Sequence, residues 1–156
     1  SAGKLILLGD LLYHGPRNDL PEGYAPREVI GMLNAMRARL LCVRGNCEAE
    51  VDQMVLKFPV LADYALLASG ETGIYCTHGH VFGEENPPPL CGGDVLLCGH
   101  THVPKLAEHA EFVYLNPGSV AIPKADSVHS YMLFDGKQFV WKSLEGGAPF
   151  LSYRLR

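Results

Sequence analysis

Short apolar runs alternate with glycine and polar residues along most of this chain, a pattern typical of buried strands bounded by turns. Between positions 29 and 40 the apolar residues instead recur at helical spacing. Pro26 suits the first turn of a helix, so a helix is predicted over 26–38. A short helix is predicted over 48–57, with acidic residues in its first turn. Strands are expected at 4–9, 40–44, 64–69, 73–77, 94–98, 111–115, 129–134 and 138–144.

The remaining stretches are rich in turn-forming residues and predict loops at 11–25 and 83–93. Two hairpins are expected, one around Gly70 and one across Asp135-Gly136, a dipeptide typical of tight turns. This order of elements predicts an α/β fold with mixed strands. The chain has 156 residues and no linker or low-complexity segment, so one domain over 1–156 is the simplest organisation.

Four of the predicted strands end in glycine or threonine followed by a residue that can bind a metal ion. Ends of several strands can meet at one edge of a sheet, where open α/β sheets usually build their sites. Carboxylate, amide and imidazole ligands suit ions such as Mn, Zn or Fe, and two ions about 3.5–4 Å apart can drive an in-line phosphoryl displacement. The four endings are Gly9-Asp10, Gly45-Asn46, Thr77-His78-Gly79-His80 and Gly99-His100-Thr101-His102.

These motifs, in this order, resemble the calcineurin-like metallophosphoesterase superfamily, and Asn116-Pro117-Gly118-Ser119 is a further signature of that family. Residues 9–26 and 43–54 resemble more narrowly its YfcE-type bacterial phosphodiesterases. The resemblance implies an α/β fold, a β-sandwich of mixed sheets flanked by helices, without the family's first strand, first helix and D-x-H motif. A longer polypeptide or a partner chain is expected to supply that segment.

The resemblance implies a phosphoesterase, most simply a phosphodiesterase, in which metal-activated water attacks the phosphate ester at a dinuclear site. By position, Asp10 would bridge the two ions. Asn46, His78 and His100 would complete the site of one ion, and His102 would bind the other together with the D-x-H pair. Mn is the first choice of metal, with Zn, Fe, Ni and Mg as alternatives because ligand type alone does not fix the ion.

Three further residues are candidates for contact with the substrate: His14, Arg17 and His80. Each has a plainer alternative, because His14 would also fix its loop, His80 would also serve a structural role, and arginines are commonest at the surface. Cys47 stands where many relatives carry a histidine that helps to protonate the leaving group. A thiol with a pKa of about 8.5 is a poorer acid, so good leaving groups should be favoured. Asn116 is expected to shape the turn beside the site.

Charge and composition limit the classes of partner that are expected. Thirteen basic and seventeen acidic residues give a net charge of −4, so no bulk nucleic-acid binding is expected. No stretch approaches the roughly 20 apolar residues of a membrane span, and no signal peptide is visible. Five cysteines without a CxxC pair indicate free thiols and a cytoplasmic location. The expected partner is a small phosphodiester or nucleotide-like substrate, and a homo-oligomer remains open.

Two other functions remain open. A catalytically inactive module with this fold would serve as a binding or scaffold protein, and the absent D-x-H motif favours it; fewer than two ions per chain would support it. A structural zinc site is the third hypothesis. Strand alternation would place Cys76, His78 and His80 on one side of a strand, and would do the same for Cys98, His100 and His102. That site would leave Asp10 unexplained and would need thiolates among apolar neighbours.

Overall fold

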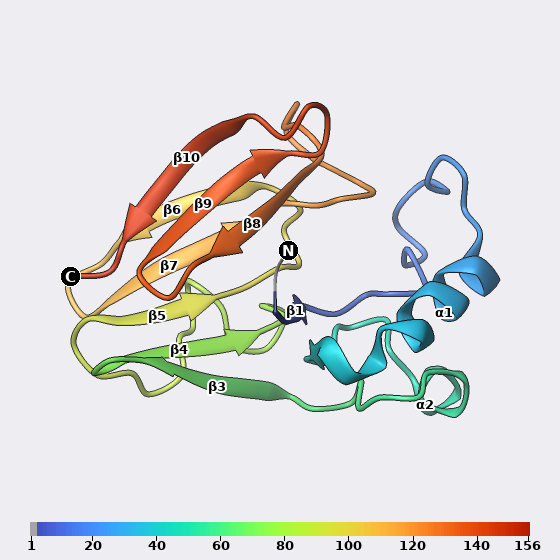
Figure 1. Cartoon of the computed structure of the whole chain (residues 1–156), viewed down its shortest axis with the longest axis horizontal. Helices are drawn as coiled ribbons and strands as arrows, with labels where there is room; N and C mark the ends of the chain where they lie inside the picture. Colours follow the sequence, from blue (N-terminus) through green and yellow to red (C-terminus); the bar gives the residue numbers. More distant parts are fainter. Residues whose placement is uncertain (1–2) are drawn as a thin grey trace.

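Two packed sheets dominate the computed structural model, which describes residues 3–156. The larger sheet is mixed, with the order β3-β4-β5-β7-β6, and the smaller is antiparallel, with the order β10-β9-β8. Figure 1 shows the smaller sheet lying across the larger one. The strands are β3 (Tyr64–Ser69), β4 (Thr72–Thr77), β5 (Asp94–Leu97), β6 (Pro104–Glu108), β7 (Phe112–Pro117), β8 (Ser130–Phe134), β9 (Gln138–Ser143) and β10 (Pro149–Arg154).

The N-terminal third forms a separate parallel pair of short strands with two helices beside it. Strand β1 (Leu5–Leu7) pairs with β2 (Leu40–Cys42), and α1 (Pro26–Ala35) with a 3₁₀ turn connects them. Helix α2 (Glu50–Val55) follows β2. Both helices lie at the same end of the molecule, next to β1 (Figure 1). Because β1-β2 and β4-β5 are parallel pairs, the two strands of each pair end on the same side, and the loops that follow these ends can meet.

The main core fills the space between the two sheets. Trp141 of β9 is fully buried there, and its indole N–H donates a 2.6 Å hydrogen bond to the carbonyl of Asn116 on β7. On the other face of the larger sheet, a second cluster packs with Leu90 from the loop at 83–93. Strands β5 and β7 are thus covered on both sides, which explains their continuous apolar runs. The main core includes Val95, Leu97, Val113, Leu115, Phe139 and Trp141.

The predicted mixed α/β sandwich is confirmed, and the differences have local causes. Strands β6 and β10 were not predicted, because each is an edge strand whose polar residues and proline hide the alternation. The helix predicted over 26–38 is α-helical only to Ala35 and continues as a 3₁₀ turn. Among the described residues, no helix is long and apolar enough to cross a membrane.

Candidate metal centre and cleft

The loops after β1, β2, β4 and β5 bring four ligand-type side chains to one point. The Nε2 atom of His78 lies 3.3 Å from Oδ2 of Asp10 and 3.1 Å from Oδ1 of Asn46. The same Nε2 atom lies 3.1 Å from Nδ1 of His100. Polar atoms of Asp10, His78 and His100 all lie within 4.8 Å of one another. Four residues far apart in the sequence therefore surround a position that a cation would fit.

The hydrogen bond on the far side of His78 prepares this ring for metal binding. His78 is 2% exposed, and its Nδ1 lies 2.5 Å from the carbonyl oxygen of Leu8. A carbonyl only accepts, so Nδ1 carries the proton and Nε2 of the neutral ring keeps a lone pair toward the cluster. His102 has the same arrangement, with Nδ1 donating to the carbonyl of Ile122 at 2.7 Å. The donor set therefore fits a divalent cation.

The cysteine-based alternative does not match this arrangement. Strand β4 ends at Thr77 and Gly79 has a φ of 111°, so the strand does not continue through His78 and His80, which the shared direction of Cys76, His78 and His80 required. Cys76 and Cys98 are fully buried, and burial raises the pKa of each thiol to about 12. The close cluster of the described residues contains a carboxylate and two imidazoles but no cysteine.

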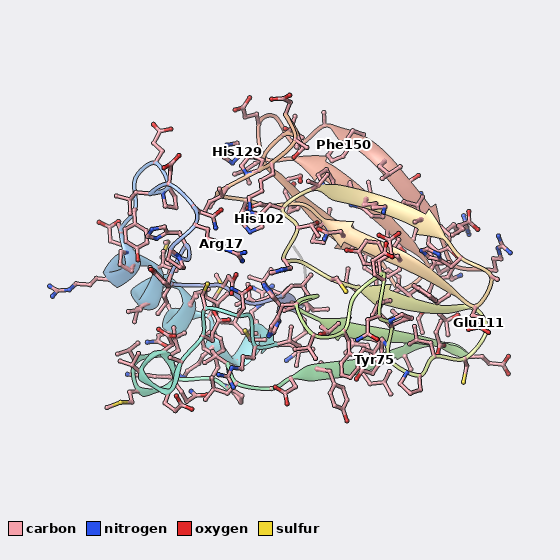
Figure 2. The ribbon with its side chains drawn as sticks, turned by 180° about the vertical axis from the view of Figure 1, so that it is seen from behind. Arg17, Tyr75, His102, Glu111, His129 and Phe150 are labelled. Atoms are coloured by element: carbon pink, nitrogen blue, oxygen red, sulfur yellow. The ribbon has the colours of Figure 1, made fainter. Side chains whose placement is uncertain are left out.

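A polar cleft of about 380 Å³ opens beside the cluster. Arg17 reaches it from the loop at 11–25, and His102 reaches it from the edge of the sandwich; Figure 2 shows the two close together. Sequence reasoning did not single out Lys124, which no recognised motif contains. The lining residues are Asp10, Arg17, Asn18, Asn46, His100, Thr101, His102 and Lys124.

Two of the predicted substrate-contacting residues lie outside the lining of this cleft. His80 stands beside the metal cluster, with its ring centroid 5.3 Å from that of His78. His14 packs edge-on between Tyr13 and Tyr24, with centroid separations of 4.9 and 5.3 Å. Its contacts match the loop-fixing alternative, and its carbonyl accepts a 2.6 Å hydrogen bond from Asn18.

Close backbone approach explains why glycine precedes the ligands. A Cβ on Gly9 would lie 2.6 Å from Cα of Gly45, and a Cβ on Gly45 would lie 2.6 Å from the amide nitrogen of Asp10. Only glycine permits the ends of β1 and β2 to approach so closely. The ligand candidates themselves adopt rare backbone conformations, since Asp10, His100 and His102 have φ values of 58°, 66° and 63°. Such strain concentrates at functional sites.

Glu48 organises the backbone around Asp10, and sequence reasoning missed this role. Its carboxylate is 5% exposed and accepts hydrogen bonds from the amides of Asp10 (2.8 Å), Leu11 (2.7 Å) and Gly45 (2.6 Å). The predicted helix placed Glu48 in a first turn, but α2 begins at Glu50. The signal in the sequence that pointed to this role is a carboxylate between the Gly45-Asn46 motif and the start of α2.

Asn116 has a corresponding role in the loop that follows β5. Its side chain is fully buried, and Nδ2 donates to the carbonyl of Gly99 at 2.6 Å and to Oγ1 of Thr101 at 3.1 Å. Its Oδ1 accepts the amide of Gly118 at 2.9 Å. Asn116 therefore fixes the loop that carries the histidines at 100 and 102, in line with the predicted turn-shaping role.

In the metal-free chain, the electrostatics of the cluster favour a protonated His78 beside the Asp10 carboxylate, and a bound cation would replace the proton on Nε2. Burial alone would raise the pKa of Asp10, but the hydrogen bond and charge of His78 and the amide of Cys47 lower it overall. Burial alone would lower the pKa of His78, but its bonds to Asp10 and to the Leu8 carbonyl raise it. Burial, followed by the charge of His78, lowers the pKa of His100. His100 is therefore a neutral ligand near pH 7.

The pair of Asp10 and His78 predicts that the stability of the metal-free chain depends on pH. The pKa of Asp10 lies below 3.8, so its stabilisation is present above that pH and is lost as the pH falls through the lowered value. The pKa of His78 lies above 6.5, so its stabilisation is complete below 6.5 and is lost as the pH rises through the raised value. Urea unfolding of the chelator-treated wild-type chain should show a greater loss of stability between pH 6 and pH 8 than urea unfolding of His78→Gln. Equal losses would contradict the charged pair.

The fold and cluster define a class: a β-sandwich protein with a candidate metal site of oxygen and imidazole groups at strand ends. Residues 3–138 match the calcineurin-like phosphoesterase superfamily domain, and the chain belongs to this family. It is 49% identical over 131 residues to phosphodiesterase YfcE of Escherichia coli strain K12, covering 84% of this chain and 71% of that protein. Family and relative together support a phosphoesterase function and imply divalent metals.

Solved structures agree with this assignment. The structure of Yfce, a phosphoesterase from E. coli, superposes with a TM-score of 0.95 at 42% identity, over 99% of this chain and 85% of that one. Vps29 of Chaetomium thermophilum superposes with a TM-score of 0.58 at 20% identity, over 99% of this chain and 83% of that one. The second likeness shows a shared fold alone.

Proposed function

We propose that this chain is a metal-dependent phosphodiesterase that hydrolyses small phosphodiesters at a dinuclear centre. The observation that carries the proposal is the convergence of Asp10, Asn46 and His100 on Nε2 of His78. These four residues would hold one ion. Asp10 would bridge to a second ion, which His102 would bind from the cleft with its free Nε2, together with the D-x-H pair that this sequence lacks and a longer polypeptide or partner chain would supply.

The proposed chemistry divides between the metal and the chain. Divalent cations supply Lewis acidity: they activate water as the nucleophile and stabilise negative charge on the phosphoryl group. The Leu8 carbonyl holds His78 in the required tautomer, and Glu48 holds the backbone of Asp10. Arg17 at the cleft and His80 beside the cluster would orient the anionic substrate.

We further propose Mn as the physiological metal, a small phosphodiester or nucleotide-like molecule as substrate, and the cytoplasm as the location. Mixed oxygen and imidazole ligation suits Mn, and Zn, Fe, Ni and Mg bind overlapping ligand sets. The free thiols at positions 42, 76 and 98 are buried, as in proteins that remain reduced. The family's metal dependence and the phosphodiesterase relative support the reaction.

The test compares hydrolysis of bis-p-nitrophenyl phosphate with that of the monoester p-nitrophenyl phosphate. Each is assayed with added Mn²⁺ and again with excess chelator. We expect diester hydrolysis that depends on the metal and exceeds monoester hydrolysis. A folded chain that hydrolyses neither ester with any of the five metals would instead support the inactive binding or scaffold module.

Replacing Cys47 by histidine should widen the range of leaving groups. Burial, followed by the charge of Asp10, raises the pKa of the Cys47 thiol to about 11, although Arg17 acts against this shift. Such a thiol is a weak proton donor at neutral pH, whereas an imidazole can assist by roughly 10²-fold or more. We expect Cys47→His to accelerate alkyl p-nitrophenyl diesters little, but dialkyl diesters strongly. Equal acceleration of both classes would contradict an acid role for this position.

A further inference from the structure

Lys124 lies at the cleft on a loop that is hydrogen-bonded to His102. The amide of Lys124 donates to the carbonyl of His102 at 3.3 Å, and His102 in turn donates to Ile122. The hydroxyl of Ser127 donates to the carbonyl of Lys124 at 2.6 Å, and the next residue, Ala125, turns the chain with a φ of 54°. The backbone that presents this lysine is therefore fixed before any ligand binds.

Arg17 and Lys124 approach the cleft from two different loops. Arg17 comes from the loop at 11–25, and its charge acts on Cys47, next to Asn46. The charge of Lys124 acts on His102 instead. Figure 2 shows Arg17 and His102 close together, although they come from different parts of the chain. The two cations therefore reach the cleft from separate loops, one acting on the residue beside Asn46 and the other on His102.

The part of the cleft beyond the metal ligands has the character of an anion site. Besides the two cations, its described lining contributes the amide of Asn18 and the hydroxyl of Thr101, both able to donate hydrogen bonds. Within residues 3–156, no tyrosine, phenylalanine, tryptophan or aliphatic side chain lines it. An acyl chain would find little apolar surface there, whereas a carboxylate or phosphate would find charge-assisted donors.

We propose that Lys124, together with Arg17, makes this site selective for phosphodiesters whose second substituent carries an additional anionic group. The inference rests on the proposed phosphodiesterase function and specifies its substrate class. The metal centre would hold the scissile phosphate, and Lys124 would bind the carboxylate or phosphate of the substituent. Lys124 is a specificity-determining residue in this account, because it acts on binding of the substituent and not on the reacting atoms.

The kinetic test uses three p-nitrophenyl diesters with the same leaving group. Their second alcohol is 3-hydroxypropanoate, propanol or choline, so the substituent is anionic, neutral or cationic. With Mn²⁺, the wild-type kcat/KM should fall in that order, by on the order of tenfold between the first two. In Lys124→Gln the kcat/KM values for the anionic and the neutral diester should differ by less than about threefold. Lys124→Arg should retain the preference for the anionic diester.

Lys137 provides a matched control, since it is an exposed lysine at the tip of the β8-β9 hairpin, away from the cleft lining. Lys137→Gln should leave both the rates and the preference unchanged. A wild-type chain that hydrolyses the propyl diester without preferring the carboxylate would overturn the inference while leaving the proposed function intact. An undiminished preference in Lys124→Gln would also overturn it.

A binding measurement separates failure of this inference from failure of the proposed function. Calorimetry compares 3-phosphonopropionate with propylphosphonate, which has the same length but no carboxylate. The first should bind the wild type on the order of tenfold tighter, and Lys124→Gln should remove most of that difference. This result would uphold the anion site even if no diester were hydrolysed, and equal binding of both phosphonates would overturn it.

Discussion

Asp10→Asn should abolish metal-dependent diester hydrolysis while leaving the fold intact. The substitution preserves size and can still accept the 2.9 Å hydrogen bond from the amide of Cys47. It removes the negative charge that faces His78 at 3.3 Å and that would be shared between two ions. Loss of a residue that only orients a ligand typically costs 10–100-fold in metal affinity or activity, so loss of the bridging ligand should lower kcat/KM by at least about 100-fold.

Asp19→Asn is the control for this experiment, because Asp19 is exposed on the loop at 11–25 and does not line the cleft. It should retain wild-type hydrolysis of bis-p-nitrophenyl phosphate and wild-type metal affinity. Thermal unfolding of both variants checks that each chain is folded at the assay temperature. Near-wild-type activity of folded Asp10→Asn would remove Asp10 from the catalytic centre.

Glu48→Gln should cause a large loss of stability. The buried carboxylate accepts three backbone amides, with the amides of Asp10 and Gly45 both bonded to Oε2. A glutamine side chain would keep one acceptor oxygen and turn its NH₂ group toward a backbone N–H. Losing charge-assisted hydrogen bonds and leaving a buried donor unpaired should lower the free energy of unfolding by about 2–3 kcal/mol.

Urea unfolding of the metal-free chain measures this effect. Glu71→Gln is the matched control, since Glu71 is exposed in the turn between β3 and β4 and should change stability by less than about 0.5 kcal/mol. Metal affinity should also fall in Glu48→Gln, because the backbone that carries Asp10 is no longer fixed. Equal stability of the two variants would show that the three amide bonds contribute nothing beyond hydration.

The elements of the sandwich could be predicted because hydrophobic pattern and turn chemistry agree in most of them. β5 and β7 are buried on both faces and read as continuous apolar runs, and Asp135-Gly136 marks the last hairpin. The edge strands β6 and β10 could not be found in this way, because packing against a neighbouring strand, and not local sequence, determines them.

The candidate ligands were predictable for a different reason, since each follows glycine or threonine at a strand end. Their convergence on His78 depends on β1-β2 and β4-β5 facing the same way, which a linear pattern does not encode. The supporting contacts of Glu48 and Asn116, and the position of Lys124, involve residues from separate loops. Long-range contacts of this kind have no local sequence signal.

Titration of the chelator-treated chain with Mn²⁺, followed by electron paramagnetic resonance of the free ion, tests the metal centre itself. We expect the wild-type chain to remove at least one ion per chain from solution and Asp10→Asn to bind it much more weakly. A folded wild-type chain that leaves all of the Mn²⁺ free, or an Asp10→Asn variant that binds it equally well, would contradict a metal centre at this cluster.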